Sequence, residues 1–453
     1  MFLFYWIHEF YLKPYRGCFI EKARITAATS DGSCRQSVKA AWLKGESTVK
    51  ILLITAAWPP CGEQNLYTDL IETFCDMGHE VTVAAVGIHA EKSGLRPEKH
   101  CRVLAVKTRP LQKTGKYRKV LFSFFAGLQL ARAVFRNFKR EPVDLIVFST
   151  PPITLLPGVL LIKRHLKAPL YLLLKDIWPD DTVGIGGMRK GGVVWRVFRF
   201  LANRTYRAAD FIGCMSEASV RYLHRHYPEL PSEKVEVCPN SRKSRKRPPV
   251  DRQAIRRQYG IPDSALVIVY GGNLGKAQGI GFLIDIAIAY RNDLAVFFLI
   301  VGTGTEALAL KRGLLTADAP NVRLLPALPS PDYEALTASC DVGLVLLHPL
   351  GRVPNFPSRL LSYLMAGLPV IVAADDATDM GDILERQQCG FKCRNGDLSR
   401  FKQAVEALKD EKKRLDMGQK SLQLFRTHYT TAVSCAAILR HFGASVKEES
   451  HDA

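Results

Sequence analysis

The sequence lacks several features that would each fix its class. No apolar run among the 453 residues reaches the roughly eighteen that span a bilayer, and the longest, 153–162, is interrupted by Pro157 and Gly158. The eleven cysteines include no Cys-x-x-Cys pair, which argues against the commonest zinc sites and favours a reduced, cytoplasmic protein. The apolar N-terminal stretch precedes its basic residues, the reverse of a secretory signal. With 47% apolar and 23% charged residues, the composition is that of an ordinary globular protein.

Acidic side chains are also few. There are 63 Lys plus Arg residues against 43 Asp plus Glu, a net charge of +20. Residues 49–240 hold 28 basic and 17 acidic side chains, residues 241–247 (SRKSRKR) are strongly basic, and residues 248–453 are nearly balanced. Such an excess indicates an anionic partner, namely nucleic acid, a membrane surface or phosphorylated substrates. We expect that partner at the first half of the chain.

Alternating strand and helix patterns predict an α/β protein with two Rossmann-like domains. The chain is too long for one hydrophobic core, and a strand–helix series occurs both before and after the basic run. We expect two doubly wound parallel sheets that face a cleft, with ligands at the carboxyl ends of the strands. The expected strands are 49–58, 80–86, 145–150, 170–175 and 210–216, then 266–272, 295–302, 321–327, 341–347 and 369–374.

These patterns also predict the divisions of the chain. We expect an N-terminal segment (1–48), a first domain (49–245), a second domain (246–428), and a C-terminal helix with a tail (429–453) that returns towards the first domain. The N-terminal segment has no clear periodicity, so it is interpreted either as an upstream extension or as an added amphipathic helix.

Two glycine-rich turns in the second domain suit a phosphate group. VYGGNLGKAQG (269–279) is a strand followed by a turn that opens a helix, where backbone N–H groups and Lys276 can meet an anion. VGTGTEAL (301–308) is a second strand-to-helix turn. Neither has the spacing of a Walker A loop or of Gly-x-Gly-x-x-Gly, and a purely structural turn is the alternative for each.

NFPSRLLSYLMAGLPVIVA (355–373) is the most specific stretch. Pro357 and Ser358 are helix-start signals, and Ser358 is expected to cap the helix. Arg359 then falls in the first helical turn, where the dipole disfavours a cation unless an anion binds there. That misplaced charge favours a phosphate ligand.

Together these segments resemble family 4 glycosyltransferases with the GT-B fold, specifically the bacterial branch that builds O-antigen and capsule repeats and includes N-acetyl-L-fucosamine transferases. The likeness covers about 49–443. Its motifs occur in the order ILLITAAWPPCGEQN…MGHEVTV, LLKDIWPDD, VEVCPN, VYGGNLGKAQG, VGTGTEAL, NVRLLPAL and PSRLLSYLMAGLPV.

The resemblance implies that the first domain binds the acceptor and the second a nucleotide-sugar, expected to be a UDP-sugar. It implies catalytic roles for Asp176, Lys276 and Arg359. It implies donor contacts from Gly62, Gly272, Asn273, Gln278, Pro326, Leu328, Ser358 and Ser362. Asp176 would orient the acceptor hydroxyl or accept its proton, although capping of the turn before Trp178 is its structural alternative.

The chain departs from the family pattern at the donor site. Many members carry two glutamates where this sequence has Pro354 and Ser362, and an Arg and a Lys where it has Asn273 and Gln278. Lys276 and Arg359 can replace the lost charge. The first alternative hypothesis is a catalytically silent, membrane-associated partner subunit. The second is a sugar-nucleotide epimerase with this fold.

The implied chemistry is a front-face transfer that retains the anomeric configuration and uses no enzymic nucleophile. No Asp-x-Asp occurs in the sequence, so we expect no metal clamp on the diphosphate, and no cofactor, because the nucleotide-sugar is itself a substrate. The leaving diphosphate would then be stabilised by Lys276, Arg359 and helix N-termini.

Two basic amphipathic segments indicate where the acceptor binds. Residues 117–142 and 193–207 combine aromatic and aliphatic positions with arginines, as interfacial helices do. Helices that pack on a sheet with solvated basic edges are the alternative. An anionic membrane that carries a saccharide linked to polyprenyl diphosphate fits this pattern. We expect no nucleic acid, because no recognition module is visible. The expected location is the inner face of the cytoplasmic membrane.

Overall fold

The fold was analysed in a computed structural model, which describes residues 48–56, 58–59, 63–86, 93–107, 116–139, 141–245 and 250–442, without the side chains of 116–122. The chain divides into two compact units, residues 1–48 with 438–453, and residues 49–437. The predictions for residues 1–47, Gly62, Arg140 and 443–453 lie outside the described residues.

The first sheet has eight strands in the order β3-β4-β2-β1-β5-β6-β7-β8. All neighbouring strands are parallel except β3 and β4. The strands are β1 (Lys50–Thr55), β2 (Glu80–Val86), β3 (Gly94–Pro97), β4 (Arg102–Val106), β5 (Leu145–Thr150), β6 (Leu170–Leu174), β7 (Phe211–Cys214) and β8 (Val235–Val237).

The second sheet has six parallel strands in the order β11-β10-β9-β12-β13-β14. They are β9 (Leu266–Asn273), β10 (Val296–Thr303), β11 (Val322–Leu325), β12 (Val342–Leu346), β13 (Val370–Ala374) and β14 (Gly390–Arg394). The predicted pair of parallel-sheet α/β domains is therefore confirmed.

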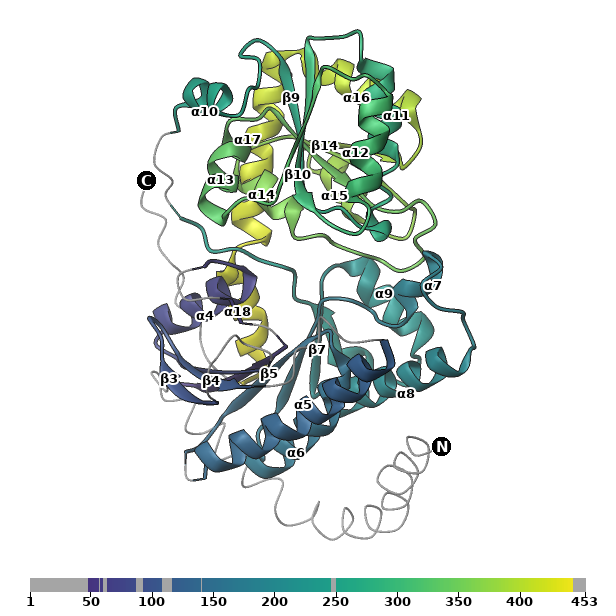
Figure 1. The fold of residues 1–453 in the computed structure, drawn as a ribbon. Helices are drawn as coiled ribbons and strands as arrows, with labels where there is room; N and C mark the ends of the chain where they lie inside the picture. The colour runs from purple at the N-terminus through teal and green to yellow at the C-terminus, as the bar shows by residue number, and fades with distance from the viewer. Residues whose placement is uncertain are drawn as a thin grey trace. The chain divides into compact units, whose positions relative to one another are not determined.

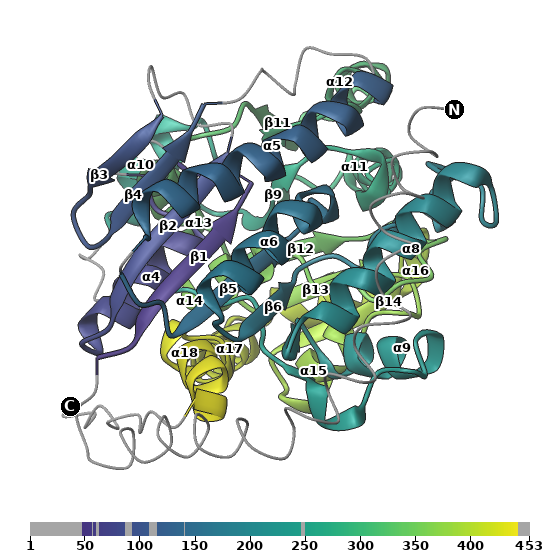
Figure 2. The same ribbon diagram turned by 90° about the horizontal axis from the view of Figure 1, so that it is seen from below.

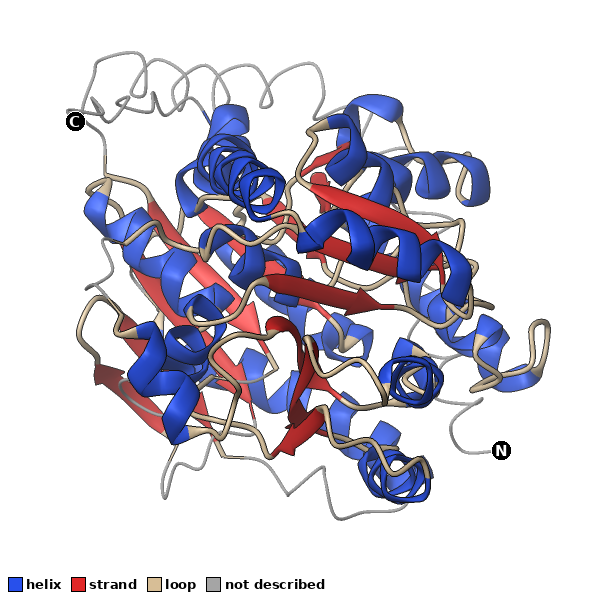
Figure 3. Cartoon of the chain, turned by 90° about the horizontal axis from the view of Figure 1, so that it is seen from above, coloured by secondary structure: helices blue, strands red, loops and turns tan. Residues whose placement is uncertain are grey.

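Helices flank the strands of each sheet (Figure 1, Figure 3). Those of the first series are α4 (Leu66–Asp76), α5 (Lys116–Asn137), α6 (Leu156–Leu166), α7 (Asp180–Gly184), α8 (Val193–Ala208) and α9 (Glu217–His226), with short 3-10 turns η1 (Ile153–Leu155) and η2 (Ser232–Lys234). Those of the second are α10 (Arg252–Gln258), η3 (Lys276–Gln278), α11 (Phe282–Tyr290), α12 (Ala307–Thr316), α13 (Ser330–Ala338), α14 (Arg359–Met365), α15 (Met380–Arg386), α16 (Leu398–Lys409) and α17 (Glu411–His428), followed by α18 (Thr431–Leu439) and η4 (Arg440–Phe442).

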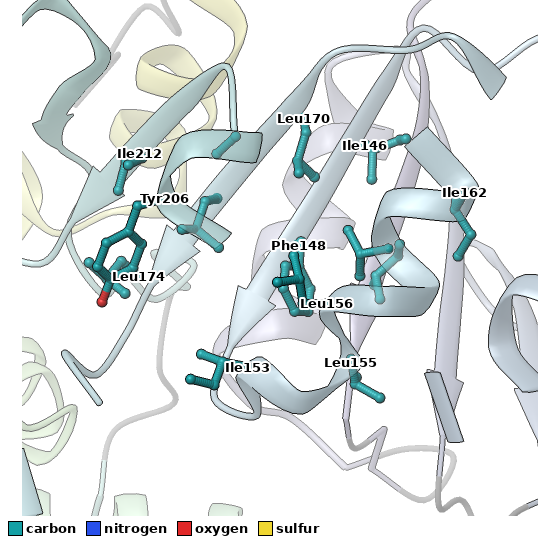
Figure 4. Packing of buried hydrophobic residues seen from close by; sticks show 14 of the residues in the cluster. Ile146, Phe148, Ile153, Leu155, Leu156, Ile162, Leu170, Leu174, Tyr206 and Ile212 are labelled. Atoms are coloured by element: carbon teal, nitrogen blue, oxygen red, sulfur yellow. The ribbon is translucent and has the colours of Figure 1, made fainter. Parts of the chain in front are cut away.

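The first core lies between β5, β6, β7 and the helices α6 and α8. Phe148, Leu156 and Tyr206 are fully buried in it, and Figure 4 shows them among aliphatic side chains of these elements. The helices α5 and α6 lie side by side on one face of the sheet (Figure 1, Figure 2). Their backbones touch at Gly127 and Gly158, where a Cβ on Gly158 would overlap the carbonyl oxygen of Gly127.

The two basic segments form the helices α5 and α8, as predicted, but their surroundings differ from the expected ones. In α5 the buried side includes Ala126, Leu130 and Val134, whereas the Phe125 side chain is 50% exposed. In α8, Arg199 pairs with Asp180 and lies 3.6 Å from the ring centre of Tyr227. Arg199, one of the arginines of the predicted basic surface, is therefore engaged by side chains of the same chain.

The basic run after the first domain is also used internally. Arg242 donates from Nε to the fully buried carboxylate of Asp69 in α4 at 2.5 Å, and from Nη2 to Glu334 in α13 at 3.0 Å. Lys243 and Arg245 pair with Glu72, and Arg245 also with Asp69. The expectation that this run is free for an anionic partner is therefore wrong for its three described cations, which neutralise acids of the same chain.

The last helix contacts the first domain. The Thr431 hydroxyl lies 2.6 Å from that of Thr73 in α4, and the Cys435 thiol lies 3.8 Å from the carbonyl oxygen of Leu70. Ser434 donates to the carbonyl of Pro239 at 3.1 Å. Residues near position 430 thus complete the surface around α4.

Candidate functional site

The strand β9 ends in a glycine turn at the carboxyl edge of the second sheet. Gly272 has a φ of +118°, which favours glycine, and a Cβ there would lie 3.5 Å from the guanidinium carbon of Arg359. At Gly302, the end of β10, an added Cβ would overlap the carbonyl oxygen of Gly272. The glycines therefore bring two strand ends together and let the Arg359 side chain lie against the backbone.

Arg359, the first residue of α14, lies within this turn. Its guanidinium carbon is 4.5 Å from the ring centre of Tyr270. Burial raises the pKa of the Tyr270 hydroxyl, and the nearby Arg359 charge opposes that rise. The Nη1 atom of Arg359 is buried and has no hydrogen-bond partner among the described residues. A buried guanidinium nitrogen without a partner costs free energy unless an anion reaches it.

The start of α14 differs from the prediction. Ser358 is the residue before the helix, but it has helical backbone angles (φ −62°, ψ −19°) and its side chain makes no capping hydrogen bond. The prediction that Ser358 caps the helix is therefore wrong. The side chain is exposed instead, beside Arg359.

Two of the predicted donor residues contact each other beside the glycine turn. Asn273 donates from Nδ2 to the Gln278 side-chain oxygen at 3.3 Å.

Sequence reasoning missed Asn395, whose Nδ2 donates to the carbonyls of Leu347, at 2.8 Å, and Gly279, at 3.2 Å. Asn395 follows β14 and is 8% exposed, so it fixes the 276–279 turn against the loop that follows β12.

Lys276 reaches towards the first domain. Its Nζ lies 3.8 Å from the position of a Cβ on Gly186, in the loop after α7. A Cβ on Gly184 would likewise lie 2.5 Å from the carbonyl oxygen of Leu350, in the loop after β12. The segment 184–186, at and after the end of α7, therefore lies beside the loops that carry Lys276 and Leu350.

Asp176 follows β6 at the carboxyl edge of the first sheet. Burial raises the pKa of its carboxyl group, and the neighbouring Lys175 opposes that rise. Burial likewise lowers the pKa of the Lys175 ammonium group. The hydroxyl of Tyr67, from α4, lies 2.7 Å from that of Ser149 at the end of β5. Lys175 and Tyr67 line a small cavity together with Leu66, Leu70, Leu173, Cys238, Pro239, Ser241 and Ser434.

Two further carboxylates in this loop were not predicted. Asp180 accepts from Trp195 at 3.2 Å and from Tyr222 at 3.3 Å, and pairs with Arg199. Asp181, the next residue, has a buried Oδ1 without a partner among the described residues. Its pKa is raised to about 7, first by burial and then by the charge of Asp176. The sequence does show two adjacent acids after Trp178-Pro179. It does not show how their surroundings differ, because those depend on the fold.

The remaining predicted donor residues are more scattered. Pro326 is exposed, Ser362 is half-buried on α14, and Leu328 is a half-buried residue that packs against the second domain's core. Among the described residues, no group of three or more His, Cys, Asp or Glu side chains is placed to hold a metal ion. Of the predicted residues, Arg359, Lys276, Asn273 and Gln278 lie at or beside the glycine turn that ends β9.

Comparison with known domain families divides the chain in the same way as the two sheets. Residues 63–241 match the model of a "Glycosyl transferase 4-like domain". Residues 265–411 match the model "Glycosyl transferases group 1".

One curated relative is WcaI of Escherichia coli (strain K12), a "putative colanic acid biosynthesis glycosyl transferase", which is 26% identical over 260 residues. The match covers 54% of this chain and 61% of WcaI, so the chain spans less than two thirds of that relative's length.

Two solved structures show the same fold. Sucrose-phosphate synthase from Thermosynechococcus elongatus superposes with a TM-score of 0.70 at 15% identity, covering 87% of this chain and 98% of that one. Anabaena Alr3699/HepE, solved in complex with UDP and glucose, gives a TM-score of 0.63 at 18% identity, covering 88% and 100%. The chain has the GT-B fold, and its two domains match models of glycosyltransferase domains.

Proposed function

We propose that the chain is a retaining glycosyltransferase that moves a hexosyl group from a UDP-sugar to a lipid-linked or growing saccharide in cell-surface polysaccharide synthesis. The observation that carries the proposal is the buried Nη1 of Arg359, which has no partner among the described residues and lies at a glycine turn on the carboxyl edge of the second sheet. Open parallel sheets bind ligands at that edge. The diphosphate of a nucleotide-sugar supplies the missing acceptor oxygen.

The proposed chemistry uses fixed charges. Arg359 and Lys276 stabilise the negative charge that develops on the diphosphate as its bond to the anomeric carbon breaks, without a metal ion. The acceptor oxygen forms its bond on the same face, and its proton passes to a departing diphosphate oxygen. Asp176 orients the acceptor hydroxyl by accepting its hydrogen bond.

The relatives support the choice of substrates. HepE was solved with UDP and glucose, and the description of WcaI refers to colanic acid biosynthesis. The combination favours UDP-sugar as donor and a saccharide as acceptor for this chain. The O-antigen and capsule assignment, including N-acetyl-L-fucosamine transfer, stays a hypothesis within this proposal.

The surface of the first domain supports acceptor binding at a membrane. Four apolar side chains are substantially exposed on α5, α6 and α8, namely Phe125 (50%), Leu161 (43%), Val193 (65%) and Val194 (47%). The arginines Arg132, Arg136 and Arg196 are exposed on two of these helices. No helix in the described part of the chain combines the length and apolar character needed to cross a bilayer. Peripheral binding to an anionic cytoplasmic leaflet is therefore our proposal for its location.

A panel of UDP-sugars tests the function directly. We expect at least one member to raise the unfolding temperature of the chain and to release UDP slowly in water. Lys276→Ala and Arg359→Ala should each reduce that release at least tenfold, whereas Arg312→Ala, which removes an exposed arginine of α12, should not.

The second candidate is a catalytically silent partner subunit. It is favoured by Pro354 and Ser362, which stand where the resemblance expects glutamates. If no UDP-sugar protects the chain and none is hydrolysed, the enzyme proposal fails and this candidate replaces it. Normal release in both cation variants would contradict the assignment of the diphosphate site.

A further inference from the structure

The helix α9 of the first domain is not capped by its own N-cap residue. Ser216 precedes the helix with the extended backbone of a cap (φ −158°, ψ 169°), and its carbonyl oxygen accepts the N–H of Val220 at 3.1 Å. Within the described residues its side chain makes no capping hydrogen bond, and its hydroxyl lies 3.5 Å from that of Ser219. An N-cap serine ordinarily accepts the second or third N–H of its helix, which here belong to Ala218 and Ser219. Ser216 thus has the backbone geometry of a cap, but its hydroxyl is not used as one.

The cap of α9 comes from the second domain. The N–H of Ala218 donates to Oδ2 of Asp379 at 2.8 Å, although the two residues lie 161 positions apart. Both are buried, and both belong to the compact unit 49–437. Asp379 itself precedes α15, which its side chain does not cap in the described part of the chain. The carboxylate therefore meets the partial positive charge at the start of a helix in the other domain.

The residues around this cap also join the two domains. Met215, between β7 and α9, is buried within the hydrophobic core of the second domain. Asn240 of the linker donates from Nδ2 to the carbonyl of Phe356 at 3.1 Å, and the same nitrogen lies 3.2 Å from the Met215 sulfur. The start of α9 is therefore a contact region between the domains, and Asp379 supplies its charged part.

Asp379 is connected to the start of α14. Its neighbour Thr378 donates from Oγ1 to the carbonyl of Asn355 at 2.8 Å, and the same hydroxyl oxygen accepts the N–H of Met380 at 3.4 Å. Asn355 belongs to the segment that leads into α14, the helix that begins with Arg359. A short series of contacts therefore joins α9 of the first domain to the helix that carries the unpartnered guanidinium nitrogen.

The contact between Asp379 and α9 also has a cost. The Oδ1 atom of Asp379 is buried and has no hydrogen-bond partner among the described residues. A carboxylate oxygen in that state loses its hydration without a replacement. The stabilisation that the cap provides is therefore partly offset at the same carboxylate, as expected of a contact that forms and breaks.

We propose that Asp379 is an interdomain latch, which caps α9 in place of Ser216 and so positions the donor site of the second domain against the first domain. When the domains separate, the Ser216 hydroxyl accepts the released N–H of Ala218. The cap exchanges between two side chains, and only Asp379 joins the domains. The role in transfer rests on the proposed function, because there the donor and the acceptor bind to different domains. Asp379 is a positioning residue in that reaction, since it acts through α9 and α14.

Hydrogen exchange tests the exchange of caps without any substrate. In the wild type Asp379 protects the Ala218 amide, so Ser216→Ala should leave its exchange rate unchanged. In Asp379→Ala the Ser216 hydroxyl takes over, so the rate should rise only slightly. The double variant has neither cap, and the peptide that carries the first turn of α9 should exchange several-fold faster than in either single variant.

Asp382→Ala is the matched control, because this half-exposed carboxylate of α15 pairs with Lys392 of the same domain. It should change exchange in α15 but not in α9. If Asp379→Ala does not fold, Asp379→Asn replaces it, and Ser216→Ala should then speed exchange in that background to a smaller extent, because an amide oxygen is the weaker acceptor. An effect of Ser216→Ala that is the same in every background would overturn the exchange of caps.

Small-angle X-ray scattering tests whether the contact holds the domains together. Without nucleotide, Asp379→Ala should have a larger radius of gyration than the wild type and Asp382→Ala, because it loses a contact between the domains. An unchanged radius of gyration would mean that Asp379 caps α9 without joining the domains, and the latch would be wrong.

The last test follows UDP release from the panel member that protects best. Asp379→Ala should lower kcat by about tenfold, because the rate depends on the alignment of groups from both domains. The affinity for UDP should stay within about twofold, because Arg359 and Lys276 belong to the second domain alone. Asp379→Asn should recover much of the rate, since its side-chain oxygen can accept the Ala218 N–H.

The kinetic result separates the latch from the proposed function. A loss of UDP affinity as large as the loss of kcat would contradict the positioning role of Asp379. If no UDP-sugar binds to the wild type, the proposed function fails together with the role of the latch in transfer. Hydrogen exchange and scattering still decide in that case whether Asp379 joins the domains.

Discussion

Arg242 in the linker and Arg359 at the start of α14 both keep guanidinium nitrogens away from water, but only one of them is neutralised by the chain. Arg242 pairs with the buried Asp69 and with Glu334. Arg359 lies over the Tyr270 ring with one nitrogen unpartnered among the described residues. The comparison teaches that a basic residue indicates a ligand only where the fold leaves its charge unpaired.

The same contrast applies to the net charge of +20. The linker cations predicted to meet an anionic partner are instead paired with Asp69, Glu72, Asp76 and Glu334. Arg359, whose buried Nη1 atom has no hydrogen-bond partner among the described residues, belongs to the nearly neutral second domain. The density of charge along the sequence therefore indicated cations that the fold pairs with acids, and not the cation whose Nη1 atom has no partner among the described residues.

The largest expected effect comes from removing Asp69, the buried acid that neutralises Arg242. Asp69→Ala should lower the free energy of unfolding by about 3–5 kcal/mol, because it leaves Arg242 and Arg245 without their buried partner. Asp76→Ala is the matched control, since Asp76 is half exposed and should cost less than about 1 kcal/mol. Denaturant unfolding measures both. Equal effects would show that the buried contact has no special weight.

Arg359 should behave in the opposite way. Arg359→Ala should leave the unfolding free energy of the free chain nearly unchanged, while it weakens UDP binding by about 1.5–3 kcal/mol, the usual range for a hydrogen bond to a charged group. Calorimetric titration with UDP, combined with unfolding of the free chain, separates the two quantities. A large loss of stability with unchanged UDP affinity would make Arg359 a structural residue like Arg242.

The glycine beneath Arg359 gives a finer test. Gly272→Ala places a side chain at a φ of +118°, which should cost about 1–3 kcal/mol and displace the guanidinium group. Gly281→Ala is the control, because Gly281 has helical angles and nothing lies within 4 Å of an added Cβ. If the two variants bind UDP equally well, the backbone path at Gly272 does not shape the donor site.

The smallest expected effect concerns the membrane. Arg196 is exposed, whereas Arg199, one helical turn away, pairs with Asp180. Arg196→Ala should therefore weaken binding to vesicles of anionic phospholipid by about 1 kcal/mol, and Arg199→Ala should destabilise the chain without that specific loss. Vesicle cosedimentation at low and high salt checks this. Equal losses of vesicle binding in the two variants would contradict the distinction between the exposed Arg196 and the paired Arg199.

Much of the fold was predictable because strands that are buried on both faces give continuous apolar runs. LIVFST and PVIVAA are examples, and both form strands where they were expected. The strands β3, β4 and β8 were missed, since segments of three to five residues carry little pattern. VEVCPN was recognised only as a motif of the resemblance, although its first three residues form β8 and pair with β7.

The candidate site was predictable in part. Glycine spacing and the misplaced Arg359 were visible in the sequence, because both reflect local backbone geometry. The surroundings of Asn395 and Asp181 were not, because they depend on partners that lie far along the chain or on the burial of a single atom. The pairing of Arg242 with Asp69 spans 173 positions, so no local pattern shows it.

The contacts of α18 have a consequence for synthesis of the chain. Thr431 and Cys435 contact Thr73 and Leu70 of α4, which emerge from the ribosome more than 350 residues earlier. Domains generally fold as they are made, from the N-terminus onward. The first domain must therefore persist with this face of α4 uncovered until residues 431–435 have been made, and during that interval a chaperone can occupy the place that α18 takes.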